Sequence, residues 1–94
     1  MNVELTILYD YYGDLLTDRQ KEYFVDYYFD NLSLQEISEN MGVSRNAVYN
    51  SLKEIEKNLN YYEETLKLYE KSKRINELVK DLDEDLKNRI KELI

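Results

Sequence analysis

Apolar residues recur three or four positions apart along most of this 94-residue chain, which is the spacing of an α-helix with one buried face. The pattern is clearest in the middle of the chain, where two apolar stripes follow one another. They consist of Leu34, Ile37 and Met41, and then of Val48, Leu52 and Ile55. Gly42 lies between them, so the pattern predicts two helices joined by a tight turn, the arrangement of a helix-turn-helix.

Capping residues mark where these two helices are expected to begin. Ser33 precedes the first stripe, and Glu36 follows three residues later, which is the spacing of a capping box. Ser44 precedes the second stripe and is a second expected N-cap. Gly42 suits the left-handed backbone position that commonly ends a helix. The agreement among these features favours a helix-turn-helix, and a plain helical hairpin is the simpler alternative.

Two more helices are expected before this motif. The first covers residues 3–12, and Gly13 is the residue expected to end it. The second opens at Thr17, where Gln20 gives another capping-box spacing, and it runs to about residue 30. Asn31 is expected to end it, because Asn tolerates a left-handed backbone. The aromatic residues expected to face one way from this helix are Phe24, Tyr27 and Tyr28, flanked by Tyr23.

The apolar spacing after the motif predicts a C-terminal helical extension. A seam with alternating steps of three and four residues runs from Leu52 to Tyr69, and its register is lost at residues 71–74. A second stripe follows over residues 75–93, so two helices with a bend near Ser72 are expected. If the last helix folds back, it covers the seam. If it does not, both stripes stay exposed and the chain is expected to dimerise.

The fold class that follows is all-α: a helical bundle that contains a helix-turn-helix and continues into one or two C-terminal helices. Residues 1–94 are expected to form a single all-helical domain, with residues 17–59 as the helix-turn-helix core and residues 60–94 as a C-terminal helical extension. The composition agrees with this fold class, because the chain has no proline and only two glycines.

The chain has neither cysteine nor histidine, which removes disulfides, the usual zinc ligands, and the thiol nucleophile and imidazole base of many enzymes. Four acidic residues match part of the spacing of a calcium-binding loop, but Leu86 occupies the position that needs glycine. These four are Asp81, Asp83, Asp85 and Glu92. An acidic helix surface is expected there instead. The sequence therefore predicts no enzyme, no metal site and no cofactor.

The formal net charge of −7 argues against strong binding to nucleic acid, because attraction to phosphate supplies much of that affinity. Residues 33–58 carry four acidic and three basic side chains, so the motif is close to neutral. Affinity for DNA is expected to be weak for one copy and to need a dimer, a partner or low salt. The N-terminus lacks the basic segment of a signal peptide, and no apolar run approaches the ~20 residues of a membrane helix. A cytoplasmic protein is expected.

The outward face of the second motif helix carries the residues best suited to touch another molecule. Arg45 and Asn46 stand near its N-terminal end and are the side-chain types that pair with guanine and adenine. Tyr49 is expected on the same face. Most of the other tyrosines recur at helical spacing and are expected to pack in the core. The polar face comprises Arg45, Asn46, Tyr49, Asn50 and Lys53.

Residues 17–59 resemble region 4 of bacterial sigma factors of the sigma-70 type. The matching residues are Thr17-Asp18-Arg19-Gln20, Leu32-Ser33, Glu36-Ile37 and Met41-Gly42-Val43-Ser44. With its flanking segments 8–13 and 61–64, the chain is similar to the YlxM-like family of small bacterial helix-turn-helix proteins. That family is all-helical and is usually encoded beside components of the signal recognition particle. The resemblance therefore implies a regulatory or accessory role in or near that pathway.

In sigma region 4 the second motif helix enters the major groove, and the resemblance implies which positions here would contact nucleic acid. They are Ser44, Arg45, Asn46, Ala47, Tyr49, Asn50 and Lys53, with Ser33 and Gln35 near phosphate. Three functions stay open. The first is binding of DNA or RNA by a homodimer. The second is a protein-interaction module that binds the GTPase or the RNA of the signal recognition particle. The third is a helical oligomer without a nucleic-acid role, and none of the three involves a membrane.

Overall fold

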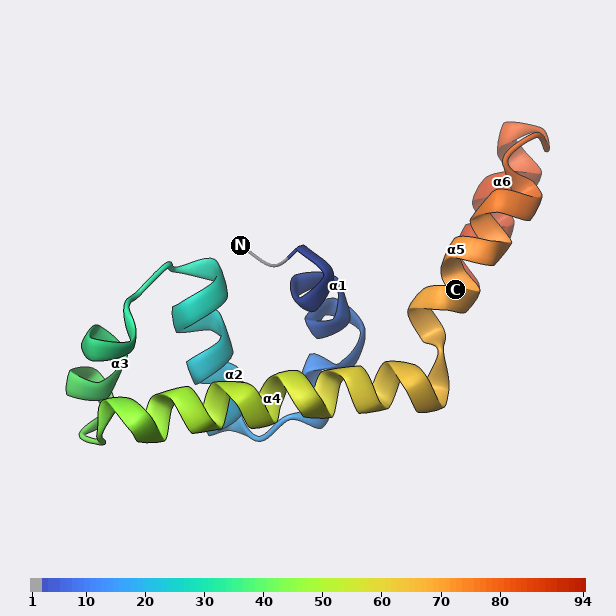
Figure 1. Cartoon of the computed structure of the whole chain (residues 1–94). Helices are drawn as coiled ribbons and strands as arrows, with labels where there is room; N and C mark the ends of the chain where they lie inside the picture. Colours follow the sequence, from blue (N-terminus) through green and yellow to red (C-terminus); the bar gives the residue numbers. More distant parts are fainter. Residues whose placement is uncertain (1–2) are drawn as a thin grey trace.

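Helix α4 (Arg45–Leu66) is the element on which the rest of the protein body packs. The structure is a computed structural model that describes residues 3–94, and the 22 residues of α4 span roughly 33 Å. Its buried stripe consists of Val48, Leu52, Ile55 and Leu59. Three helices pack against it: α1 (Val3–Tyr12), α2 (Asp18–Phe24) and α3 (Leu34–Met41). Figure 1 shows them side by side along one side of α4, so a single helix organises the core.

The predicted helix-turn-helix is present as α3, a turn over residues 42–44, and the start of α4. Ser33 and Glu36 form the capping box of α3: each side chain accepts the backbone N–H of the other at 3.0 Å. Gly42 follows with φ of 68° and ends α3 in the left-handed region. The hydroxyl of Ser44 then accepts the N–H of Ala47 at 3.1 Å. These contacts confirm the boundaries that the sequence predicts for the motif.

The helix that opens at Thr17 does not stay regular to residue 30. Its capping box with Gln20 is confirmed, because each side chain accepts the backbone N–H of the other. After α2, however, the chain forms one π-helical turn, η2 (Val25–Phe29), in which the N–H of Asp30 donates to the carbonyl of Val25 at 2.9 Å. Asn31 follows with φ of 57°, which confirms its left-handed role. The prediction of a regular helix over this range is wrong in its last turn.

Aromatic packing gives the physical reason for this π-turn. The buried ring of Phe24 stacks on Tyr9 with ring centroids 4.5 Å apart. It also contacts Tyr28 at 4.5 Å and Phe29 at 5.9 Å, which are residues four and five positions later. A wider turn brings both of those rings to Phe24. Tyr27 is 37% exposed and lines a pocket together with Tyr28, so these two tyrosines share one side of the helix as expected.

Helix α1 has the predicted range, but Gly13 ends it for a different reason than expected. Gly13 begins a short 3₁₀ turn, η1 (Gly13–Leu15), and Gly42 is the one glycine with a positive φ. A Cβ at Gly13 would lie 3.1 Å from Cε2 of Tyr9. Glycine is therefore favoured at this position by the closely packed tyrosine ring, which a Cβ would have to displace by a few tenths of an ångström, and not by a left-handed backbone.

The chain breaks after α4 at Lys67 and not near Ser72. Lys67 has φ of 57°, and α5 (Leu68–Val79) begins directly after it. The hydroxyl of buried Tyr12 accepts the N–H of Leu68 at 2.9 Å and donates to Oε1 of Glu63 at 2.6 Å. The tyrosine, which lies 51 residues earlier than Glu63, thus helps to fix where the new helix starts.

The carboxylate of Glu63 completes the cap of α5 from the preceding helix. Its Oε1 accepts the N–H of Tyr69 and its Oε2 accepts the N–H of Glu70, each at 3.1 Å. Helices commonly use a residue at their own N-cap for this purpose, but Lys67 makes no such side-chain bond. The break is therefore set by a contact between distant parts of the chain, which local spacing does not reveal.

Residues 68–94, called the C-terminal arm below, form two helices, whereas the apolar stripe over residues 75–93 predicts one continuous helix there. Helix α6 (Glu84–Lys91) begins at Asp83, whose carboxylate accepts the N–H of Leu86 at 3.0 Å. Figure 1 shows the arm rising away from the end of α4, so the last helix does not lie along α4. The radius of gyration is accordingly 16.7 Å, against about 12 Å for a compact domain of this length. Helix α4 itself crosses from the 17–59 core into the 60–94 extension, and that division stays a prediction.

The buried stripes and the open face of α4 are expected to respond differently to truncation. Ile37→Ala removes a fully buried side chain and is expected to lower the free energy of unfolding by about 2–5 kcal/mol. Asn50→Ala, on the exposed face, is the matched control and is expected to change it by less than about 0.5 kcal/mol. Urea unfolding followed by circular dichroism measures both, and equal losses would show that the helix faces are assigned wrongly.

Tyr12→Phe tests the junction between α4 and α5. It leaves the N–H of Leu68 without its partner, so a loss of about 1–3 kcal/mol in unfolding free energy is expected. Burial, together with the hydrogen bond to Glu63, raises the pKa of Tyr12 above its ordinary value of 10.0. The folded protein then holds this proton more tightly than the unfolded chain, so stability falls as the pH rises past that value. The decline between about pH 9 and 11 is expected to be shallower in Tyr12→Phe than in the wild type. An equal decline in both proteins would exclude this role of the hydroxyl.

Candidate nucleic-acid interface

The first three turns of α4 present an open polar face opposite the buried stripe. Eight of the nine residues predicted to contact nucleic acid are exposed, and Ala47 is half-buried. The exposed ones are Ser33, Gln35, Ser44, Arg45, Asn46, Tyr49, Asn50 and Lys53. They come from the starts of α3 and α4 and from the turn between these helices. Seven of the nine lie in the turn or in the first three turns of α4, and Ser33 and Gln35 lie at the start of α3, at the end of that helix away from the turn. Their role in binding stays a prediction.

Three of these side chains are free to bind another molecule. Within residues 3–94, Arg45, Asn46 and Asn50 make no side-chain hydrogen bond or ion pair. Two others already have acidic neighbours: Gln35 donates to Glu39 at 3.1 Å, and Lys53 lies 3.6 Å from Glu56. Both of these contacts are at the surface and are weak in water, so a phosphate group could replace the carboxylates.

The backbone at the start of α4 adds a partial positive charge to this face. Among the α-helices of residues 3–94, α4 alone has no acidic residue in its first turn. The acids in the first turns of the others include Glu4, Asp18, Glu36, Glu70 and Glu84. Since an acidic side chain would neutralise the positive end of the helix dipole, α4 keeps an end that favours a bound anion.

The same packing that forms the core holds this face rigid. Val48 and Leu52 anchor the first turns of α4 from the opposite side, and both are buried. Met41 and Val43, on either side of Gly42, pack partly against the core. The side chains of Arg45 and its neighbours therefore project from a backbone that cannot rotate without exposing apolar surface.

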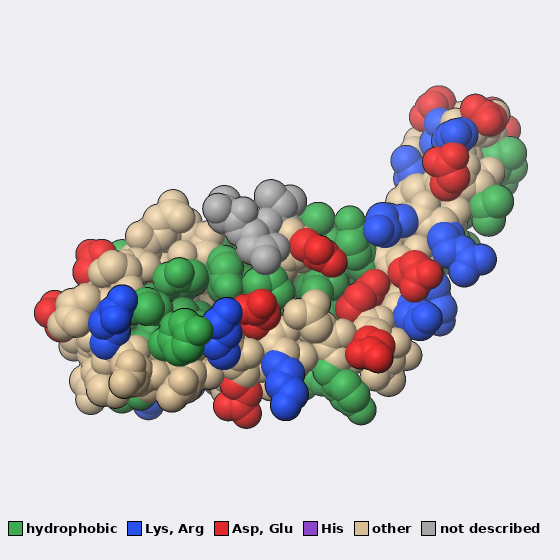
Figure 2. All heavy atoms as spheres, viewed as in Figure 1, with side chains coloured by type: hydrophobic (Ala, Val, Ile, Leu, Met, Phe, Trp, Pro, Cys, Tyr) green, Lys and Arg blue, Asp and Glu red, His purple; other side chains and the backbone are tan. Residues whose placement is uncertain are grey.

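A cluster of tyrosines lies beside the polar face. Tyr49 is 49% exposed, with the ammonium group of Lys53 5.6 Å from its ring centroid. The π-turn places exposed Tyr27 and partly buried Tyr28 next to this pair, and all four line one pocket. Burial and the nearby Glu56 raise the pKa of Tyr28 above its ordinary value of 10.0. Figure 2 shows apolar side chains gathered over the N-terminal half of α4, bordered by basic ones.

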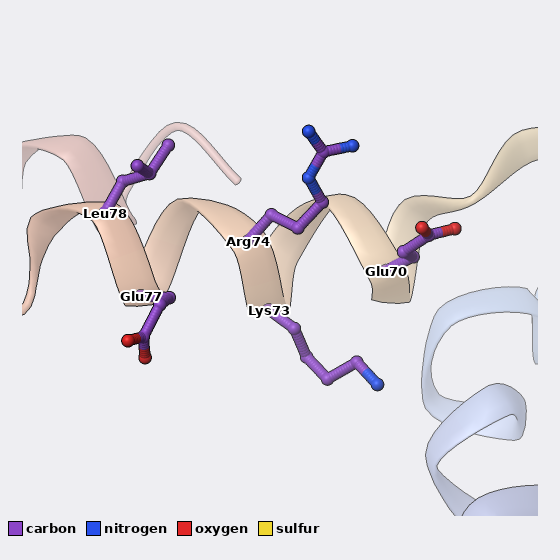
Figure 3. Close-up of a pocket in the computed structure, with 5 residues that line it drawn as sticks. All are labelled: Glu70, Lys73, Arg74, Glu77 and Leu78. Carbon is purple, nitrogen blue, oxygen red and sulfur yellow. The ribbon is translucent and has the colours of Figure 1, made fainter.

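The C-terminal arm carries exposed basic residues, although the net charge of the chain is −7. Lys71, Lys73 and Arg74 are all exposed on α5. Glu70 and Glu77 lie among them, and Lys73 rests 4.4 Å from the ring centroid of Tyr69. In Figure 3 the lysine and the arginine point to opposite sides of the helix. These cations therefore do not converge on a single ligand.

The described residues offer little for other kinds of site. No three acidic side chains within residues 3–94 are arranged to hold a metal ion. None of the helices in that range combines the length and the apolar character needed to cross a bilayer. Asp83, a member of the rejected calcium pattern, is engaged as the N-cap of α6.

Comparison with known proteins relates the whole chain to one family. The family described as "Putative helix-turn-helix protein, YlxM / p13 like", also called UPF0122, matches residues 1–94. A UPF0122 protein of Caldanaerobacter subterraneus subsp. tengcongensis is 52% identical over 58 residues, which are 62% of this chain and 50% of the relative. A UPF0122 protein of Malacoplasma penetrans is 44% identical over 59 residues, 63% of this chain and 55% of the relative. One of Listeria innocua is 45% identical over 58 residues, 62% of this chain and 53% of the relative. The matched segment thus spans about half the length of these curated relatives.

Proposed function

The chain belongs to the YlxM / p13-like helix-turn-helix family, and on that premise we propose that it is a non-catalytic regulatory protein that binds nucleic acid. The contact is made by the polar face at the start of α4. The observation that carries the proposal is that Arg45, Asn46 and Asn50 have no partner within residues 3–94 and project from a helix end without an acidic first turn. The bound nucleic acid is bacterial DNA or RNA in the cytoplasm.

Each residue of the face has a role that follows from its chemistry. Arg45 donates two hydrogen bonds to a guanine edge, and Asn46 pairs with an adenine edge. Ala47 offers a small apolar surface, and Asn50 a further amide. Phosphate is held by Lys53 and by polar groups at the two helix starts, which fix the orientation of the protein without reading sequence. Those polar groups are Ser33, Gln35 and Ser44.

A net charge of −7 sets the main constraint on this function. Long-range attraction to phosphate is weak, so two polar faces acting together are needed for useful affinity. We place the dimer contact on the C-terminal arm, where leucines face solvent. Leu78 is 81% exposed, and Leu86 and Leu93 are also exposed. Apolar side chains gathered on a projecting helix pair are typical of a protein interface.

A second function is favoured by the acidic surface and the exposed arm. The protein would then bind the RNA or the GTPase of the signal recognition particle, with the helix-turn-helix acting as a scaffold. Long-range attraction draws an acidic protein to a basic protein partner and not to the RNA itself, and such a complex weakens with salt. The two functions differ in whether they need the polar face of α4.

Arg45→Ala distinguishes them. At ~50 mM salt it is expected to weaken binding to a duplex roughly 5- to 150-fold, the cost of one lost base contact. Arg89→Ala removes the same charge from the exposed surface of α6 and is expected to have little effect. A gel-shift or anisotropy titration measures both variants. Equal binding by wild type and Arg45→Ala contradicts the first function. A salt-sensitive complex with the purified particle RNA or GTPase that survives Arg45→Ala supports the second.

Leu78→Glu tests the dimer. The wild-type chain of 11.4 kDa is expected to elute at twice its mass when size-exclusion chromatography is coupled to light scattering, and Leu78→Glu as a monomer. Tyr61→Glu, at another exposed apolar position, is the control and is expected to remain dimeric. A monomeric wild type, or a Leu78→Glu variant of unchanged mass, would rule out this interface.

A further inference from the structure

A pocket lies where η2 meets α4, beside the polar face. Three tyrosines from two elements line it: Tyr27 and Tyr28 from the π-turn, and Tyr49 from α4. Leu52 contributes apolar surface to the pocket. The volume of the pocket is about 130 Å³. A pocket that holds a whole drug-sized molecule is typically roughly 300–1,000 Å³. This one therefore suits a single flat ring system that belongs to a larger molecule.

The rings that border the pocket are exposed although they are large and apolar. Tyr27 is 37% exposed and lies 5.0 Å from Tyr28, centroid to centroid, with the two rings nearly perpendicular. Tyr49 lines the same pocket from α4 and is 49% exposed. Aromatic rings presented in this way are platforms on which a base can stack.

Tyr27 lies within the π-turn, three positions after Phe24. Turns of this kind are rare and are often found at functional sites. The π-turn packs Tyr28 on the core, leaves Phe29 43% exposed at the edge of Phe24, and carries Tyr27 at the pocket.

The polar groups at the pocket match the edge of a base. Lys53 supplies donors, and Glu56, 3.6 Å from it, supplies acceptors. The phenol of Tyr28, which also lines the pocket, can donate as well. A purely apolar side chain from a partner would make no hydrogen bond to Lys53 or Glu56. Bases carry both donors and acceptors on their edges, so an aromatic slot with a lysine and a glutamate fits them better.

The geometry points to a stacking site for one unpaired base, held between Tyr27 and Tyr49 with its edge toward Lys53 and Glu56. This inference rests on the proposed nucleic-acid function and narrows it. Tyr49 and Lys53 belong both to the pocket and to the polar face, so a duplex on that face brings an adjacent unpaired base to the pocket. The preferred ligand is a duplex that contains a bulged base, a feature abundant in folded RNA.

Four labelled probes test the site by fluorescence anisotropy at ~50 mM salt. They are an RNA duplex, the same duplex with one extra unpaired adenosine, and the corresponding pair in DNA. Stacking of one base is expected to make the bulged member of a pair bind roughly 5- to 150-fold more tightly. Preference in both pairs supports a site for the base alone, and preference in the RNA pair only supports RNA as its source.

Variants of Tyr27 test whether the preference for the bulged duplex arises at the pocket. Tyr27→Ala is expected to reduce the ratio of the two affinities to near one, and Tyr27→Phe, which keeps the ring, is expected to retain it. Tyr61→Ala is the matched control, because Tyr61 is a 61% exposed tyrosine on the far half of α4, outside the pocket. Circular dichroism checks that each variant is folded.

The outcomes separate this site from the proposed function. Equal affinity for the two members of each pair, or a preference that Tyr27→Ala leaves intact, overturns the stacking site. Duplex binding that depends on Arg45 would still uphold the proposed function in that case. Absence of binding to all four probes overturns both. Photocrosslinking of 5-iodouridine placed at the unpaired position, with the crosslink on Tyr27 or Tyr49, is the expected supporting result.

Discussion

Burial of one stripe of α4 is the constraint from which the rest of the structure follows. Val48, Leu52, Ile55 and Leu59 lose almost all contact with water by packing on α1, α2 and α3. Rotation of α4 about its axis would expose this stripe, at a cost of about 1.5–3 kcal/mol for each large side chain. The opposite face is fixed by the same packing, and so Arg45, Asn46 and Asn50 project outward on a rigid support.

The second constraint is the junction made by Tyr12 and Glu63. One buried hydroxyl and one carboxylate satisfy the first N–H groups of α5, and they do so from α1 and α4. The arm therefore leaves the body at a defined angle, even though few other contacts hold it. Its exposed leucines and its projection from the body give it the form of an interaction element, separate from the polar face.

What the sequence predicts correctly is local, and what it misses depends on distant contacts. The capping boxes at Thr17 and Ser33 and the turn at Gly42 follow from residues within four positions of one another. The π-turn forms because Phe24 packs on Tyr9, which lies in another helix. The break at Lys67 depends on the hydrogen bond between Tyr12 and Glu63, which lie 51 residues apart in the sequence. Spacing alone indicates neither contact.

The candidate site likewise has one part that the sequence predicts and one part that it does not. The exposure of Arg45, Asn46 and Lys53 could be predicted, since a helix with one buried stripe has only one open face. The pocket could not, because it forms where η2, α3 and α4 meet, and spacing along the chain does not reveal how these elements pack. The motif is nearly neutral and the chain has a net charge of −7. We therefore expect the proposed binding to nucleic acid to depend on close contacts and not on long-range attraction.

The most direct measurement is a titration of isotopically labelled protein with a nucleic-acid duplex, followed by NMR through the amide shifts. If the start of α4 is the contact surface, the largest changes will fall on residues 44–50, with small changes on α6, and they will diminish as salt is raised. Changes centred on the C-terminal arm, or none at ~50 mM salt, would contradict that assignment.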